Sequence, residues 1–291
     1  MNKLIVILGP TACGKTDLSI KLAKRFKGAV VSADSRQVYQ GMNIGTGKIT
    51  KKEMQGIPHY LLDVTSPKRR FSVAQYQKMA YRAINKIIQN KGVPFLVGGS
   101  PFYVYSIIYG WGFPALKANL PLRQRLGKKT EEQLFAILKK LDPKRAKQID
   151  SKNKRRLVRA VEIAKSLGEV PQFKKNPQYA CLLIGIKKGK EELSQLVHKR
   201  LLKRFRQGMV AEVKRLKANG LSWKKLDDFG LEYRWIARYL QNKINKQEMV
   251  AFLQKDIEHF AKRQMTWFKK DPNIHWVKNE KAAEKLIKTF L

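Results

Sequence analysis

Eight residues near the N-terminus, Gly9-Pro-Thr-Ala-Cys-Gly14-Lys15-Thr16, have the pattern of a phosphate-binding loop. They stand between an apolar run, Lys3 to Leu8, and a helical pattern, which is the strand-loop-helix context that such a loop requires. The glycines let backbone amides curl around an anion, the lysine neutralises charge, and the Thr16 hydroxyl can hold Mg²⁺. The segment therefore predicts a phosphate or diphosphate site. Its predicted contact residues are Gly9, Thr11, Ala12, Cys13, Gly14, Lys15 and Thr16.

A carboxylate is predicted beside this loop. Asp34 directly follows the apolar run Ala29 to Ala33, which reads as the second strand. The carboxyl ends of parallel strands meet at the edge of the sheet that carries the phosphate loop, so Asp34 can face a bound phosphate. The competing interpretation is an aspartate that caps a turn or a helix.

The loop alone does not identify the phosphate compound. A nucleoside triphosphatase or a small-molecule kinase is the common reading of such a loop, and Tyr60-Leu-Leu-Asp63 adds an apolar strand ending in a carboxylate that could assist Mg²⁺. A kinase therefore stays open at this point.

The charge of the chain points to a polyanionic partner. Sixty-one Lys and Arg against 22 Asp and Glu give a formal net charge of +39, which repels itself unless an anion compensates it. Nucleic acid is the leading partner, and a lysine-rich surface without such a partner is the alternative. The two cysteines and four separated histidines favour neither a disulfide framework nor a zinc cluster, and we expect a reducing cytoplasm.

The elements that must position these residues are those of an α/β protein. Further short apolar runs occur at Phe95 to Val97 and Cys181 to Ile184, and helix-length segments separate most of the runs. A capping box at Ser72 to Gln75 begins one of these helices. This alternation predicts a parallel sheet flanked by helices, a core like that of the phosphate-loop NTPases. No apolar run approaches the roughly 18 residues of a membrane span, and we expect no membrane segment or signal peptide.

Strand signals disappear between residues 115 and 178. Two helices are predicted there, from Thr130 onward and from Asn153 to Leu167. The chain is mainly helical again over 191–219, 233–241 and 247–269, followed by a short segment at 274–277. We expect a catalytic core made of residues 1–114 and 179–291, with 115–178 as an inserted all-helical lobe.

Several motifs together resemble the tRNA dimethylallyltransferases, which are also called tRNA isopentenyltransferases. The phosphate loop has their form, and Asp34-Ser-Arg-Gln-Val-Tyr39 with Met42-Asn-Ile-Gly-Thr46 resembles their signature stretch. Further similar segments are Pro58-His-Tyr-Leu-Leu-Asp63, Phe71-Ser72 with Tyr76, Val97-Gly-Gly99 with Tyr103, and Ala261-Lys-Arg-Gln-Met-Thr-Trp267. They follow the family's order along nearly the whole chain.

This resemblance implies transfer of a dimethylallyl group from dimethylallyl diphosphate to N6 of adenosine 37, next to the tRNA anticodon. Asp34 then takes the N6 proton, while Thr11, Lys15, Thr16 and Arg204 hold the diphosphate and the developing charge. Mg²⁺ is the implied cofactor, and Thr16 its implied protein ligand. A carboxylate suits this chemistry because the amine is a poor nucleophile until it loses a proton.

The resemblance also implies contacts with the tRNA anticodon stem-loop, several of them in the helical insertion. The implied contact residues are Asp34, Ser35, Arg36, Gln37, Ser100, Arg123, Arg155, Arg156, Arg159, Lys262, Arg263, Gln264 and Trp267. For the arginines at 155, 156 and 159, a solvated helix face is the alternative. Other tryptophans have spacings more typical of a core and receive no role.

Three departures from the family pattern stand out. Ser100 replaces a usual threonine and is followed by Pro101, Gly47 stands where alanine is frequent, and Glu232 replaces a glycine. The last change puts the local RNA contacts of its segment in doubt. A kinase and a free-adenylate dimethylallyltransferase remain as alternatives, and the strongly basic chain favours tRNA over free adenylate.

Overall fold

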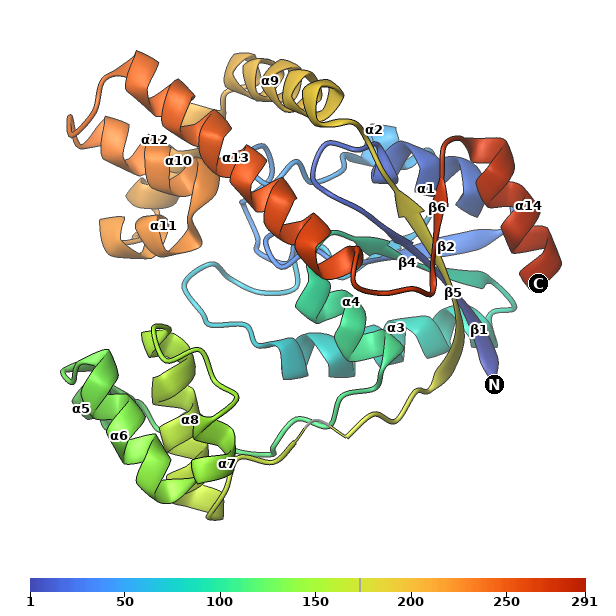
Figure 1. Cartoon of the computed structure of the whole chain (residues 1–291). Helices are drawn as coiled ribbons and strands as arrows, with labels where there is room; N and C mark the ends of the chain where they lie inside the picture. The colour runs from blue at the N-terminus through green and yellow to red at the C-terminus, as the bar shows by residue number, and fades with distance from the viewer. Residues whose placement is uncertain (173) are drawn as a thin grey trace. The chain divides into compact units, whose positions relative to one another are not determined.

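The chain folds into two compact units, seen in a computed structural model that describes residues 1–172 and 174–291 (Figure 1). The first unit contains Met1–Gly110 and Pro177–Leu291, and the second contains Trp111–Asn176. The boundaries of the second unit lie within a few residues of those expected for the helical insertion. None of the helices described is both long and apolar enough to cross a membrane.

A parallel six-stranded sheet, in the order β3-β2-β4-β1-β5-β6, is the centre of the first unit within the described residues. This confirms the predicted α/β class. Its strands are β1 (Asn2–Leu8), β2 (Gly28–Ser32), β3 (His59–Tyr60), β4 (Val93–Gly98), β5 (Tyr179–Ile186) and β6 (Ile274–Val277). The sixth strand was expected only as a short segment, and it completes the sheet by pairing with residues 183–186 of β5.

The register of the central strands fixes the edge where the site forms. Leu8 of β1 lies opposite Gly98 of β4 on one side and Gly185 of β5 on the other. Ser32 of β2 lies opposite Val97. The segments that follow β1, β2 and β4 therefore leave the sheet at one edge, as expected for parallel strands.

Helices cover both faces of this sheet (Figure 1). On one face, α1 (Lys15–Arg25) and α14 (Glu280–Phe290) contribute Leu22, Ala23 and Ile287 to a core with the strands. On the other face lie α3 (Val73–Gln89) and α4 (Pro101–Ile108). The predicted capping box is present at the start of α3, where Ser72 and Gln75 cap each other.

The C-terminal half of the first unit adds a group of helices beside the sheet. They are α9 (Lys190–Arg206), α10 (Met209–Ala218), α11 (Trp223–Phe229), α12 (Leu231–Leu240) and α13 (Lys246–Phe268). The region 191–219 is mainly helical, as expected, and Gly208, which has a φ of 94°, separates α9 from α10. The short helix α2 (Lys51–Met54) lies between β2 and β3 in the chain.

The second unit is all-helical. It contains α5 (Leu120–Gly127), α6 (Glu131–Leu141), α7 (Pro143–Ala146) and α8 (Lys154–Leu167). Its own core includes Leu126, Leu134, Leu138, Leu157 and Val161. The sequence indicated α6 and α8 but not α5 and α7. The two missed helices are short, and each has one proline within its first two positions.

Candidate active site

The phosphate loop leaves β1 with the backbone of an anion-binding turn. Gly9, Ala12 and Gly14 have φ values of 150°, 64° and 92°, and Gly14 is the N-cap of α1. A Cβ on Gly9 would lie 2.6 Å from the carbonyl oxygen of Ile186, so only glycine fits there. The Lys15 ammonium donates to the carbonyl oxygens of Gly9 and Pro10, at 3.0 and 2.6 Å. The loop therefore offers curled amides and a lysine held close to them.

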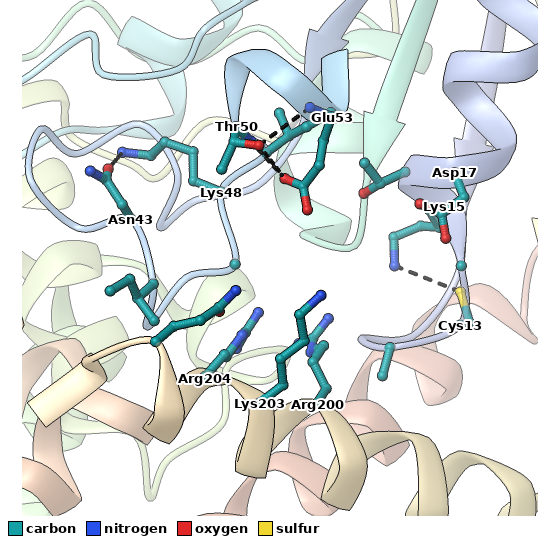
Figure 2. Close-up of a pocket in the computed structure, with 17 residues that line it drawn as sticks. Cys13, Lys15, Asp17, Asn43, Lys48, Thr50, Glu53, Arg200, Lys203 and Arg204 are labelled. Carbon is teal, nitrogen blue, oxygen red and sulfur yellow. Dashed lines mark hydrogen bonds between the residues drawn. The ribbon is translucent and has the colours of Figure 1, made fainter. Parts of the chain in front are cut away.

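A cavity of about 490 Å³ opens in front of this loop (Figure 2). Three segments line it: the phosphate loop, residues 43–53, and α9. Figure 2 shows Arg200, Lys203 and Arg204 pointing from α9 into the cavity, while Lys15 enters from the phosphate loop. A cavity with this many cations is suited to a di- or polyphosphate.

Arg200 is a site residue that the sequence analysis missed. Its Nη2 donates to the Thr11 hydroxyl at 2.5 Å, which ties α9 to the phosphate loop. Burial, together with the nearby Arg204 charge, lowers the pKa of Arg200 to about 9. Its position four residues before Arg204 on one helix face is the signal that could have identified it.

Arg204 is buried beside Arg200 and is held by two acceptors. Its Nη1 donates to the Gly45 carbonyl and to the Glu232 carboxylate, at 3.0 Å each. Its Nη2 lies against Gly47, where a Cβ would be only 1.7 Å away. Glycine at this position thus makes room for the guanidinium.

Glu232 therefore has a structural account that the sequence did not provide. The residue is buried, with 7% of its surface exposed, and it is the second residue of α12. Burial raises its pKa, and the charges of Arg204 and Arg200 oppose that rise. Glu232 therefore forms a buried ion pair with Arg204, the arginine that is predicted to bind diphosphate.

A second buried carboxylate shapes the loop over the cavity. Glu212 accepts hydrogen bonds from the backbone amides of Asn43, Ile44 and Gly45, at 2.8, 2.7 and 3.1 Å. The Tyr233 hydroxyl donates to it at 2.9 Å. Four donors to one carboxylate fix the loop that presents Gly45 to Arg204.

Asp34 lies at a smaller adjoining cavity of about 60 Å³. Lys15 and Thr16 line both cavities, so both spaces border the phosphate loop. Asp34 Oδ1 accepts from the amides of Arg36 and Gln37, at 2.8 and 3.4 Å. Among the described residues, Oδ2 has no hydrogen-bond partner. Asp34 thus caps a turn with one oxygen and lines the small cavity, which combines both interpretations of the sequence.

Several predicted tRNA contacts gather around this edge. The Ser100 hydroxyl accepts from the Ser35 amide at 2.9 Å, and Gln37 Nε2 donates to the carbonyl oxygen of Gly47 at 3.2 Å. Arg36 packs over the ring of Phe229, with 5.5 Å between the guanidinium carbon and the ring centroid. The chain thus brings Ser35, Arg36, Gln37 and Ser100 together beside Asp34.

The predicted contacts on α13 divide into two groups. Lys262, Arg263 and Trp267 are exposed, and the Trp267 ring meets Phe102 edge-on with centroids 5.6 Å apart. Gln264 is only 4% exposed; it accepts from the Thr11 amide at 2.8 Å and donates to the Gly99 carbonyl at 2.6 Å. The prediction that Gln264 contacts tRNA is therefore wrong, because both ends of its amide bind the protein.

Two of the predicted tRNA arginines in the second unit also have internal partners. Arg123 makes two hydrogen bonds to the fully buried Glu162, at 2.9 and 2.7 Å, and Arg159 makes a third. Arg155 and Arg156 are exposed. Arg123 and Arg159 therefore act as structural partners of a buried carboxylate, and their side chains remain 26% and 34% exposed.

The kinase interpretation loses its second carboxylate. Asp63 forms an ion pair with Lys48 at 2.6 Å and does not line either cavity described above. The Lys48 side chain is 5% exposed, so this pair fixes the loop of residues 43–48. Asp63 is thus a structural residue in this fold.

Known proteins share this sequence and fold. Residues 37–271 match the family model described as IPP transferase. A tRNA dimethylallyltransferase of Halothermothrix orenii is 39% identical, over 94% of this chain and 87% of its own length. One from Alkaliphilus oremlandii is 37% identical, over 100% of this chain and 96% of its own length.

Solved structures extend the comparison. The tRNA isopentenylpyrophosphate transferase of Bacillus halodurans superposes with a TM-score of 0.74 at 34% identity, covering 99% of this chain and 94% of its own. A eukaryotic dimethylallyltransferase acting on tRNA shares the fold, with a TM-score of 0.82 at 22% identity. Because the family match includes most of the chain and the bacterial relatives align along nearly all of it, the protein belongs to the IPP transferase family.

Proposed function

We propose that this protein transfers the dimethylallyl group of dimethylallyl diphosphate to N6 of adenosine 37 in tRNA and releases diphosphate. The observation that carries the proposal is a pair of cavities that share lining residues. The larger is lined by the phosphate loop and the cations of α9, and the smaller by Asp34, with Lys15 and Thr16 common to both. We expect a diphosphate bound in the first space to direct its ester carbon toward the carboxylate in the second.

The larger cavity supplies what a leaving diphosphate needs. As the C–O bond of the donor breaks, its electron pair moves onto a diphosphate oxygen, and negative charge builds there. Lys15, Lys203, Arg200 and Arg204 line the space in which that charge develops. The amides of the phosphate loop add oriented donors at the N-terminus of α1.

The predicted Mg²⁺ site fits this arrangement only in part. Thr16 lines both cavities, but the described residues contain no group of three or more His, Cys, Asp and Glu that could hold a metal by themselves. Mg²⁺ commonly takes few protein ligands and binds substrate phosphates instead. Thr16 would hold the ion together with diphosphate oxygens, and the ion would add neutralising charge to the leaving group.

Asp34 completes the exchange at the acceptor. N6 forms a bond to the prenyl carbon while its proton passes to the Asp34 carboxylate. Oδ1 is engaged by two backbone amides, so Oδ2 is the oxygen assigned to the proton. The two amide bonds hold the carboxyl group in place for this step.

The acceptor must reach this site as an unstacked base, which a single-stranded loop allows at low cost. The anticodon loop is proposed to bind to two groups of residues. The first is Lys262, Arg263 and Trp267 on α13, and the second is Arg36 beside Asp34. In the second unit, Arg155 and Arg156 are proposed to bind tRNA phosphates. The insertion, residues 115–178, is proposed as a tRNA-contacting lobe on that basis.

The direct test is a product assay. The protein is incubated with dimethylallyl diphosphate and unmodified tRNA, and the digested nucleosides are searched by mass for N6-prenyladenosine. Free adenylate in place of tRNA tests the adenylate dimethylallyltransferase, and ATP tests the kinase. Prenylated adenylate without prenylated tRNA, or ATP consumption alone, would overturn the proposal.

A further inference from the structure

Arg204 lies in an environment that limits how strongly it can bind an anion. Arg204 is only 5% exposed, and a buried cation requires a counterion or strong acceptors. Its Nη1 is shared between the Gly45 carbonyl and Glu232, and Glu232 is its ion-pair partner among the described residues. The charge that Arg204 presents to the cavity is therefore already partly neutralised.

The room for this pair is built into the chain. A Cβ on Gly47 would lie 1.7 Å from the Arg204 Nη2, so the guanidinium fits only because this residue has no side chain. Glu212 and Tyr233 fix the backbone of the loop that contains the Gly45 acceptor. Glu232 and Gly47 are two of the departures from the family pattern noted in the sequence, and both lie against the same guanidinium.

We propose that Glu232 is a positioning residue that acts through Arg204 as a built-in counterion and thereby weakens diphosphate binding. This inference rests on the proposed function, because it takes diphosphate as the ligand of the cavity. Glu232 orients the guanidinium through a hydrogen bond and at the same time reduces the positive potential acting on the anion. Bound diphosphate is then held less tightly after transfer, which favours its release.

The conservative variant Glu232→Gln separates the two effects. The amide oxygen can still accept from Arg204, so the orientation is retained, but the negative charge is lost. One unit charge several ångströms from the ligand, at an effective dielectric constant of about 20, corresponds to a roughly ten- to hundredfold change in affinity. We expect Glu232→Gln to bind inorganic diphosphate more tightly by this factor in calorimetric titrations of the full chain.

The matched control is Glu284→Gln. Glu284 also pairs with an arginine, at 2.7 Å from Arg25, but it lies on α14 and does not line the cavity. This variant makes the same change in net charge and should leave the affinity for diphosphate unchanged. Equal affinities in the parent, Glu232→Gln and Glu284→Gln would overturn the inference and leave the diphosphate site intact. If the parent chain itself does not bind inorganic diphosphate, the donor site and this inference both fail.

A double variant keeps the test informative if a lone buried Arg204 prevents folding. Arg204→Gln combined with Glu232→Gln removes both charges and leaves no unpaired buried ion, an exchange that proteins often tolerate. Because Glu232 already neutralises much of the charge that Arg204 presents, this double variant should bind diphosphate less than tenfold more weakly than the parent, which is a smaller loss than that expected for one full charge. A larger loss would show that Arg204 acts on diphosphate with its full charge and that Glu232 only supports the fold. In multiple-turnover assays, Glu232→Gln should lower the steady-state rate relative to the single-turnover rate.

Discussion

Two buried carboxylates, Glu162 in the second unit and Glu232 in the first, both pair with arginine, but their surroundings differ. Glu162 receives hydrogen bonds from Arg123, Arg159 and the Asn119 amide. Burial by itself raises its pKa, but these donors outweigh burial and bring the pKa to about 2. Glu232 has one arginine partner in the ion pairs described, and its pKa is raised by burial.

The difference separates a structural cluster from a binding site. At Glu162 the protein supplies enough donors to compensate the carboxylate, and the arginines are used for that purpose. At Glu232 the compensation is incomplete, and the arginine that it holds faces a cavity. For an arginine that the sequence suggests for RNA or phosphate binding, the number of hydrogen bonds that its carboxylate partner accepts thus helps to separate a structural role from a ligand-binding role.

Asp34 is a third carboxylate in this comparison, and only one of its two oxygens accepts hydrogen bonds from the residues that the structure describes. We expect its substitution to have the largest effect on activity. Asp34→Asn should keep the fold and lower turnover by about 10²–10⁴-fold, the range for a positioned general base. Donor affinity and melting temperature should barely change. Single-turnover rates, donor titration and melting on one preparation measure all three. A loss of donor affinity along with rate would assign Asp34 to Mg²⁺ instead, and near-normal turnover would remove it from the chemistry.

The opposite pattern is expected at Glu162. Glu162→Gln should lower stability by about 2–3 kcal/mol, because charged hydrogen bonds to two arginines are lost, while affinity for diphosphate stays the same. Chemical denaturation followed by calorimetry tests both. Glu169→Gln, an exposed carboxylate of the same unit, is the control and should shift stability by less than about 0.5 kcal/mol. A fall in diphosphate affinity in Glu162→Gln would erase the distinction between the two clusters.

Acid should affect the two carboxylates with opposite sign. The folded pKa of Glu162 is about 2, below its ordinary 4.5, so its contribution to stability is present above pH 4.5 and is lost as pH falls toward 2. The folded pKa of Glu232 is raised, so its contribution is present below pH 4.5 and is lost as pH rises through the folded value. Urea midpoints between pH 2 and 7 should show a shallower acid loss in Glu162→Gln than in the parent. A parallel profile for the two proteins would contradict the assignment.

The smallest effect concerns the exposed arginines beside the Glu162 cluster. Each phosphate contact in a loop RNA contributes about 0.7 to the logarithmic salt slope of binding. Arg155→Ala with Arg156→Ala should flatten the slope for tRNA accordingly. Lys139→Ala with Lys140→Ala removes the same charge from α6 of this unit and should leave the slope unchanged. Equal slopes for the parent and the arginine variant would return Arg155 and Arg156 to a solvated helix face.

Local patterns predicted the part of the site that is continuous in sequence. The phosphate loop needs its glycines, lysine and threonine within eight residues, and Asp34 follows a strand whose end position is dictated by parallel pairing. The parallel sheet followed from the alternation of apolar runs and helical segments for the same reason.

Tertiary contacts determined the rest. Arg200 became a site residue through Thr11, and Glu212 through three amides of a distant loop. Gln264 is buried because it binds the Thr11 amide and the Gly99 carbonyl, and no local motif predicts these two contacts. A family motif contains the same polar residue whether that residue binds a ligand or another part of the protein, so the motif alone does not distinguish the two roles.

The Gln264 bridge has a consequence for how the chain is synthesised. Its two bonds join α13 to the Thr11 amide, 253 residues earlier in the chain, and to the Gly99 carbonyl, 165 residues earlier. On the ribosome, the phosphate loop emerges first but cannot be clamped until α13 has also left the exit tunnel. Contacts of such long range form late, since the intervening chain must close before they stabilise it. A nascent chain that ends before α13 therefore carries the phosphate motif without the two Gln264 contacts, so this part of the pocket is completed only after α13 has been synthesised.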